Sequence, residues 1–265
     1  MKVIEMGKVK IGDDKPVLIA GPCAIESEGM AIHTAEKLTE IAQKFAIPFV
    51  FKGSYDKANR LSIQSGRGLG FPAGLSVLRK IKENLDIPIL TDVHETYQVE
   101  AVASVVDILQ IPAFLCRQTD LILAVASTGK VINIKKGQFI QPDDMKYLIG
   151  KAEFVGNDKI ILTERGTCFG YGDLIFDPRS VIIMKEFGYP ILVDVTHLCQ
   201  RPGTGEGMSS GNRKYAVPFA KIGLTLGASG IYMEVHPQPE NAISDKDIQI
   251  PLDNAEQVIR EIFEV

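Results

Sequence analysis

The chain has 265 residues, of which 45% are hydrophobic and 23% are charged, and this composition is typical of a folded globular protein rather than a disordered one. Lysine and arginine number 29 and aspartate and glutamate number 33, so the formal net charge is −4. No basic run offsets this acidity, and we therefore expect no nucleic-acid partner.

Compartment and membrane association follow from the charged residues and the cysteines. Charges spread through residues 1–20 leave no apolar core for a signal peptide. The longest uncharged stretch near the end, residues 222–233, is well short of the roughly 20 apolar residues of a membrane span. The cysteines at 23, 116, 168 and 199 form no C-x-x-C pair and are too sparse for a disulfide framework. We expect a cytoplasmic protein without a membrane partner.

The first predicted element is a β-hairpin, because apolar residues alternate around Gly7 over residues 2–11. Eight short apolar or β-branched runs follow and predict strands at 17–20, 49–51, 89–91, 108–111, 131–134, 160–163, 191–193 and 230–233. Amphipathic stretches between them predict helices, among them 30–45, 74–85, 96–106 and 178–187.

Eight alternating strand and helix units predict a (β/α)8 TIM barrel of the α/β class. We expect one catalytic barrel domain over residues 1–265, with residues 1–15 as an N-terminal β-hairpin that covers the barrel bottom. A doubly wound open sheet is the competing fold, but no G-x-G-x-x-G follows an early strand.

Polar residues follow all eight predicted strands, and in a barrel these ends converge on the face that carries the active site. They are Cys23, Lys52, Lys57, Asp92, His94, Gln110, Lys135, Lys136, Glu164, Arg165, Asp194, His197, Glu234 and His236. Any one of them could be a solvated loop residue, but that explanation is much weaker for the whole set.

Two chemical groups stand out within this set. The first is a group of cations, Lys52, Lys57, Arg60, Lys135 and Arg165, which predicts a binding site for phosphate or carboxylate. The alternative is that some of these cations pair with Glu164 or Asp92. The second offers thiolate, imidazole and carboxylate ligands that suit Fe2+ or Zn2+ better than Mg2+ or Ca2+: Cys23, His197, Glu234 and Asp245. Their long separations leave a buried thiol and a hydrogen-bonded histidine as the alternative interpretation.

A glycine-rich segment at residues 203–211 predicts a loop on the same face. Such loops often close over substrate, although a merely flexible surface loop fits the composition equally well.

Several longer strings carry a family resemblance. The chain reads AGPC at 20–23, KANR at 57–60, QIPAFLCRQTD at 110–120, TERG at 163–166 and EVHP at 234–237. From about residue 16 onward it resembles the 3-deoxy-D-manno-octulosonate 8-phosphate synthases. The resemblance implies a barrel enzyme that condenses phosphoenolpyruvate, D-arabinose 5-phosphate and water into the eight-carbon product and inorganic phosphate, a step toward lipopolysaccharide.

The resemblance also implies substrate-binding roles for individual residues. The phosphate of phosphoenolpyruvate is expected to contact Lys135, Arg165, Ala113 and Phe114. Its carboxylate is expected to face Lys57, with Lys52 and Gln110 close by. Asn59 and Arg60 are expected to hold the pentose hydroxyls and phosphate, and Asp92 to orient the sugar. Because family members are tetramers, Arg117 is expected to reach the pentose phosphate of a neighbouring subunit.

Family members with cysteine after Ala-Gly-Pro depend on a metal, whereas those with asparagine there do not. Cys23 and the Asp245-x-x-x-Gln249 pattern place this chain in the metal-dependent branch. The resemblance therefore implies a divalent transition metal on Cys23, His197, Glu234 and Asp245. Fe2+ or Zn2+ is favoured, with Mn2+, Co2+ or Cd2+ as other candidates, and His197 could also shuttle a proton.

Departures from the family affect the aldose more than the chemistry. Leu61 stands where serine or threonine is usual, and Gln64 and Leu69 replace a common histidine and proline. The nearest alternative is 3-deoxy-D-arabino-heptulosonate 7-phosphate synthase, which uses erythrose 4-phosphate. A Schiff-base aldolase using Lys135 and a non-catalytic phosphosugar-binding barrel are further alternatives.

Overall fold

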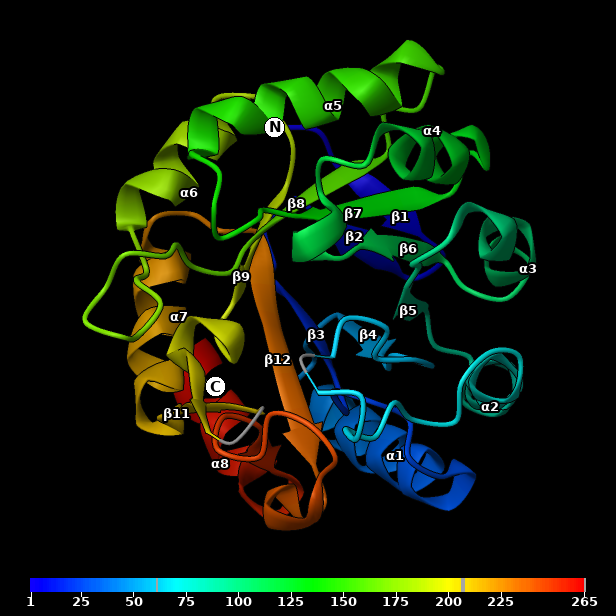
Figure 1. Ribbon diagram of the computed structural model, residues 1–265, viewed down its shortest axis with the longest axis vertical. Helices are drawn as coiled ribbons and strands as arrows, with labels where there is room; N and C mark the ends of the chain where they lie inside the picture. The colour runs from blue at the N-terminus through cyan, green and yellow to red at the C-terminus, as the bar shows by residue number, and fades with distance from the viewer. Residues whose placement is uncertain (61, 206–207, 265) are drawn as a thin grey trace.

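Eight parallel strands close into a barrel at the centre of the computed structural model, which describes residues 1–60, 62–205 and 208–264 (Figure 1). They are β3 (Val17–Gly21), β4 (Phe49–Lys52), β5 (Ile89–Asp92), β6 (Ile108–Ile111), β7 (Val131–Lys135), β8 (Ile160–Glu164), β9 (Ile191–Asp194) and β12 (Gly230–His236). Successive strands pair in order, and β12 pairs with both β3 and β9. This closure confirms the predicted TIM barrel, because an open doubly wound sheet would leave two edges.

Helices surround the barrel and pack on its outer face (Figure 1). They are α1 (Glu28–Lys44), α2 (Ala73–Leu85), α3 (Val99–Ala103), α4 (Thr119–Ser127), α5 (Met145–Phe154), α6 (Pro178–Lys185), α7 (Ala216–Thr225) and α8 (Leu252–Phe263). The helix predicted at 96–106 is shorter, because residues Thr96–Gln98 form a 3-10 turn before α3. Among the described residues, no helix is long and apolar enough to cross a membrane.

Seven of the eight strands extend one to three residues past their predicted C-terminal ends. The added residues include Lys52, Asp92, Lys135, Glu164 and Asp194, which hydropathy assigned to the following loops. Sheet pairing uses backbone groups, so a polar side chain that faces the barrel interior does not end a strand. As a result, several of the predicted site residues stand on the rigid barrel wall.

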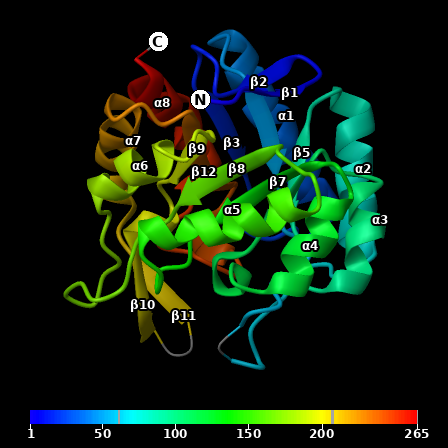
Figure 2. The ribbon, with the colours of Figure 1, turned by 90° about the horizontal axis from the view of Figure 1, so that it is seen from above.

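The predicted N-terminal hairpin is present as β1 (Ile4–Met6) and β2 (Val9–Ile11). Its buried side chains pack against residues inside the barrel, including Val17 and Tyr232. Figure 2 shows the hairpin at the end of the molecule that also holds both termini. The hairpin therefore closes the barrel at the end opposite the C-terminal strand ends.

The segment predicted as a loop at 203–211 belongs instead to a second antiparallel pair, β10 (Gln200–Gly205) and β11 (Met208–Gly211). This pair projects from the far end of the molecule (Figure 2). The glycines that suggested an irregular loop do not prevent backbone pairing. Residues 206 and 207 lie outside the described part of the chain.

The buried face of the hairpin generates a stability prediction. Ile11 is fully buried, so Ile11→Ala removes apolar contacts and leaves a cavity; we expect a loss of about 2–5 kcal/mol in the free energy of unfolding. Chemical denaturation measures it, with Lys10→Ala on the exposed face of the same strand as the control. A loss for Ile11→Ala as small as that of the control would contradict the assigned packing.

Candidate active site

The C-terminal ends of the barrel strands surround a cavity of about 450 Å³. The predicted site residues that line it are Lys52, Lys57, Asn59, Arg60, Asp92, Gln110, Ala113, Phe114, Lys135, Arg165, His197, Glu234 and Asp245. Among the described residues that were assigned a substrate, catalytic or metal role, only Cys23 and Arg117 are outside this lining. The cavity therefore gathers residues from positions spread over most of the sequence.

A larger hollow of about 840 Å³ lies at the opposite end of the barrel, beside the β1–β2 hairpin. Charges around it pair in exposed or half-exposed ion pairs, such as Lys8 with Asp86 and Lys82 with Asp107. Surface pairs of this kind contribute little energy and do not converge on a common point. The smaller cavity is the better candidate, because buried ionisable groups converge there.

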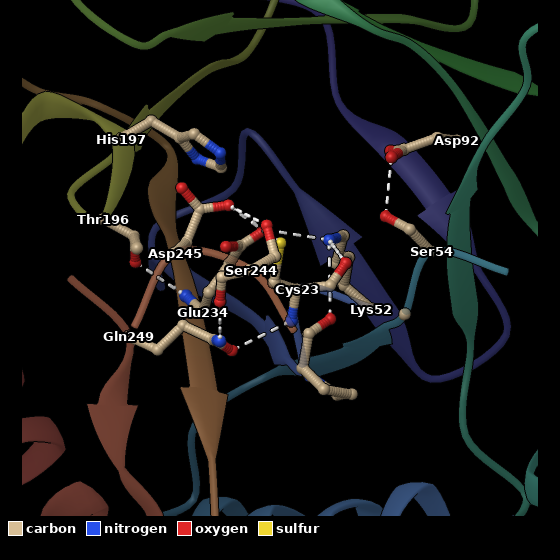
Figure 3. Close-up of polar contacts among 12 residues, drawn as sticks. Cys23, Lys52, Ser54, Asp92, Thr196, His197, Glu234, Ser244, Asp245 and Gln249 are labelled. Carbon is tan, nitrogen blue, oxygen red and sulfur yellow. Dashed lines mark hydrogen bonds and ion pairs between the residues drawn. The ribbon is translucent and has the colours of Figure 1, made fainter. Parts of the chain in front are cut away.

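Cys23, Glu234 and Asp245 bring one ligand atom each to within 4.8 Å of one another (Figure 3). Strand pairing explains the first contact: β12 runs beside β3 with Glu234 opposite Gly21, two residues before Cys23. The third residue is held by Gln249, whose Oε1 accepts from the Cys23 N–H at 3.0 Å and whose Nε2 donates to the Ser244 carbonyl at 2.8 Å. Segments from both ends of the chain thus meet at one point.

The ionisation of the two carboxylates in this group suits a cation. Burial raises the pKa of the Cys23 thiol, and its Sγ donates to Asp245 Oδ2 at 3.1 Å. Burial by itself raises the pKa of both carboxyl groups. Lys52, His197 and Lys57 together outweigh it at Glu234, and His197, Lys57 and the hydrogen bonds from Ser244 and Cys23 together outweigh it at Asp245, so both pKa values are lowered. Glu234 Oε2 is buried and lacks a hydrogen-bond partner among the described residues. A thiol and two carboxylates, one of which has an unpartnered buried oxygen, fit a divalent transition metal.

His197, the fourth predicted ligand, is not within this group of three. It begins a 3-10 turn (His197–Cys199) after β9, and its Nδ1 lies 2.8 Å from Asp194 Oδ2. That contact leaves Nε2 on the opposite side of the ring, and the ring lies next to Asp245 in Figure 3. The role of His197 as a ligand stays a prediction.

Two of the predicted cations, Lys52 and Lys135, are buried in the barrel mouth and have carboxylate partners other than those expected. Lys52 Nζ lies 2.9 Å from Glu234 Oε1, and both side chains are inaccessible to solvent. Lys135 Nζ lies 2.6 Å from Asp194 Oδ2 and 4.0 Å from the centre of the Tyr232 ring. The alternative pairing with Glu164 or Asp92 is therefore wrong for these two lysines.

Arg165 carries a buried donor that is suited to bind an anion. Its side chain is buried, and burial lowers its pKa against the opposing effect of nearby carboxylates. One terminal nitrogen, Nη2, donates to Gln200 Oε1 at 3.2 Å, whereas the buried Nη1 has no partner among the described residues. An unpartnered buried guanidinium donor costs energy unless an anion accepts from it.

Charge in the cavity is positive although the protein is acidic. Five lysine and arginine side chains line it, against the three carboxylates Asp92, Glu234 and Asp245. A bound divalent cation would add to this excess. Electrostatics therefore favour ligands that carry several negative charges.

Asp92 is fixed by its neighbours rather than free to move. Ser54 Oγ donates to it at 2.6 Å, and Gln110 Nε2 donates to its other oxygen. Behind Gln110, Asn133 and Thr163 continue the hydrogen bonds across β7 and β8. Burial raises the Asp92 pKa, but Lys52 and Lys57 hold it well below its usual range, so Asp92 is a carboxylate in a fixed orientation.

Arg117 is a predicted substrate-binding residue that does not line this cavity. Arg117 is exposed after a 3-10 turn (Ala113–Leu115), and its carbonyl accepts from Lys151 Nζ at 2.8 Å. It therefore contributes nothing to the cavity of its own chain. Leu61 lies outside the described residues.

Sequence reasoning missed several residues of the site. Tyr232 lies two residues before Glu234 on β12, so the strand period of two could have placed it inside the barrel. Asp194 was noted only as a strand-end residue, yet it contacts both Lys135 and His197. Gln200 and Ser244 contact Asp245 from distant or irregular segments, and no pattern in the sequence indicates them.

The ligand cluster generates a binding prediction. Cys23→Ala removes the thiolate, and we expect Co2+ affinity to fall by more than about 100-fold, the upper end of what losing an outer-shell partner costs. Equilibrium titration measures the affinity. Cys199→Ala is the matched control, because Cys199 is also buried but its Sγ donates to the Val195 carbonyl. Equal Co2+ affinity in the two variants would show that Cys23 is only structural.

Comparison with known proteins places this geometry in a family. The model of the DAHP synthetase I family matches residues 1–264. A 2-dehydro-3-deoxyphosphooctonate aldolase of Rickettsia prowazekii is 52% identical over 259 residues, 97% of this chain and 94% of that protein. One from Geotalea daltonii is 48% identical over 263 residues, 99% and 97% of the two chains. That name denotes the synthase family which the sequence motifs resemble, so the resemblance is confirmed. The chain belongs to the DAHP synthetase I family.

Proposed function

We propose that this chain condenses phosphoenolpyruvate with D-arabinose 5-phosphate and water to form 3-deoxy-D-manno-octulosonate 8-phosphate and inorganic phosphate, in lipopolysaccharide biosynthesis. The relatives are named for an eight-carbon acid. Removing the three carbons of phosphoenolpyruvate from that acid leaves an aldopentose. The single observation that carries the proposal is a cavity in which buried cations surround a possible metal-ligand cluster.

Phosphoenolpyruvate is assigned to the side of the cavity formed by β6, β7 and β8. The unpartnered Nη1 of Arg165, with Lys135 and the backbone at Ala113 and Phe114, would bind its phosphate. Lys57, with Lys52 and Gln110 nearby, would face its carboxylate. Several cations are needed, because bringing two multiply charged substrates together is otherwise repulsive.

The aldose phosphate is assigned to the loop after β4. Asn59 and Arg60 would hold the pentose hydroxyls and phosphate, and the fixed carboxylate of Asp92 would orient the sugar. Exposed Arg117 would reach the phosphate in a neighbouring subunit of a homotetramer. Its position outside its own cavity supports that assignment.

The metal is assigned to Cys23, His197, Glu234 and Asp245, with Fe2+ or Zn2+ favoured and Mn2+, Co2+ or Cd2+ as alternatives. When bound, a divalent ion supplies Lewis acidity that polarises a carbonyl or lowers the pKa of water. His197, Glu234 and Asp245, the three proposed ligands that line the cavity, would keep this chemistry beside the substrates.

Bond changes follow from the substrates and from the groups that face them. C3 of the enol forms a bond to the aldehyde carbon of the aldose, and the aldehyde oxygen becomes a hydroxyl. Water adds at C2, and cleavage of the bond between C2 and the phosphate-bearing oxygen releases phosphate and leaves a ketone. Asp194 holds Nδ1 of His197, so Nε2 is the nitrogen that would bind the metal. The proton transfer that the family motifs imply for His197 would use the same Nε2 when no metal is bound to it. Lys57 and Asp92 would orient the reacting carbons.

Two other functions are less well supported. The family model is named for the synthase that uses erythrose 4-phosphate, but relatives of about half identity carry the octonate name. A Schiff-base mechanism needs a lysine with a free lone pair. Lys135, the candidate for that role, is ion-paired with Asp194. We also place the enzyme in the cytoplasm, consistent with its scattered cysteines.

The assignment predicts a clear order of aldoses. Phosphate release from phosphoenolpyruvate should require an aldose phosphate and should have its highest kcat/KM with arabinose 5-phosphate, ahead of ribose 5-phosphate and erythrose 4-phosphate. Steady-state phosphate release measures all three substrates. A preference for erythrose 4-phosphate would assign the heptulosonate reaction, and release without any aldose would contradict the condensation.

A further inference from the structure

Arg60 links two loops across the cavity mouth. Its Nη1 donates to Ser244 Oγ at 2.8 Å, and its Nη2 donates to the Ile243 carbonyl at 3.3 Å. The third nitrogen, Nε, donates to the Gly66 carbonyl at 2.8 Å within its own loop. A guanidinium carries five N–H donors. After these three contacts, two N–H donors of Arg60 remain for a ligand in the cavity.

Ser244 connects Arg60 to the ligand cluster. Its hydroxyl accepts from Arg60 and donates to Asp245 Oδ2 at 2.6 Å (Figure 3). The other Asp245 oxygen, Oδ1, accepts from Gln200 Nε2 at 2.9 Å. A hydroxyl that accepts from a cation becomes a better donor, so the two bonds through Ser244 strengthen each other.

The backbone around Asp245 needs such support. Asp245 has a φ of +54°, in the left-handed region that costs energy for a residue other than glycine. Neighbouring contacts hold it there: the Ser244 carbonyl accepts from Gln249, and the Ile243 N–H donates to Glu26 Oε1 at 3.0 Å. Ser244 itself is buried. Its hydroxyl therefore bonds to Arg60 and Asp245 rather than to bulk water, and it holds the Asp245 carboxylate in position relative to Arg60.

We propose that Ser244 is a positioning residue which couples the aldose-phosphate end of the cavity to the metal end. An anion held by Arg60 and a divalent metal held by Cys23, Glu234 and Asp245 then strengthen each other's binding. The inference rests on the proposed function for the roles of the two ends. The physical reason is conformational entropy. A ligand that fixes Arg60 also fixes the Ser244 hydroxyl and the Asp245 carboxylate, so binding of the second ligand costs less conformational entropy.

Thermodynamic linkage makes the coupling measurable from either end. Co2+ is titrated into the metal-free full chain, and the absorption of the bond between Co2+ and the Cys23 thiolate reports binding. The titration is repeated with arabinose 5-phosphate, without phosphoenolpyruvate, so that no turnover occurs. Unphosphorylated arabinose is the control sugar. We expect the sugar phosphate to tighten Co2+ binding by about 5- to 150-fold, the usual range of such couplings.

The variants separate positioning from a general loss of structure. Ser244→Ala should weaken Co2+ binding by about 10- to 100-fold and remove the effect of the sugar phosphate. Ser244→Thr keeps the hydroxyl and should keep the coupling. Ser104→Ala is the matched control, because that hydroxyl donates to the Ala101 carbonyl on an exposed helix end. Circular dichroism confirms that each variant is folded.

Two results would overturn the proposal: a wild-type Co2+ affinity that arabinose 5-phosphate does not change, or a Ser244→Ala chain that keeps the wild-type coupling. The wild-type titration alone tests the coupling if Ser244→Ala does not fold. Failure of the proposed function has a different signature, because wild-type enzyme would then release no phosphate with any aldose phosphate. Uncoupled binding in an enzyme that still turns over would contradict the coupling and leave the proposed function standing.

Discussion

The pairing of β12 with β3 is the interaction on which the site depends. Its register sets Glu234 opposite Gly21, beside Cys23, and the neighbouring strand β4 brings Lys52 to Glu234. The close approach of β4 to β3 requires glycine at position 21, since a Cβ there would lie 1.9 Å from the Lys52 carbonyl oxygen. Removing one partner of such a buried ion pair costs about 3–5 kcal/mol. The strand pairing that closes the barrel therefore also brings the opposite charges of the site together.

The arrangement reconciles an acidic protein with anionic substrates. Two of its interior carboxylates are neutralised by a neighbouring lysine, Glu234 by Lys52 and Asp194 by Lys135, and this weakens their repulsion of the substrates. The hydrogen-bond donors outside these ion pairs, above all Nη1 of Arg165 and the two N–H groups of Arg60 without a protein partner in the described residues, are held in place before any ligand binds. Such preorganised charge stabilises a crowded anionic transition state without further rearrangement.

Much of the fold could be predicted from the sequence. Eight apolar runs, each followed by polar residues, were enough to place a barrel and its functional face, because strand ends in a barrel converge. Hydropathy failed at Lys135 and Asp194, which continue their strands, and at residues 203–205, where β10 forms by backbone pairing. Ser244 could not be predicted, since its importance arises only when Arg60, 184 positions away, contacts it. Spacing alone could not indicate the metal ligands, and their assignment depends on the family motifs.

The proposed reaction depends most on a divalent metal bound among the lysine and arginine side chains of the cavity, and metal removal tests this claim most directly. Purified enzyme is chelated exhaustively, then assayed for phosphate release from phosphoenolpyruvate and arabinose 5-phosphate before and after Fe2+ or Mn2+ is returned. The cluster of Cys23, Glu234 and Asp245 predicts that chelation abolishes the release and that metal restores it. Full activity after chelation, with no metal detectable in the sample, would contradict the account.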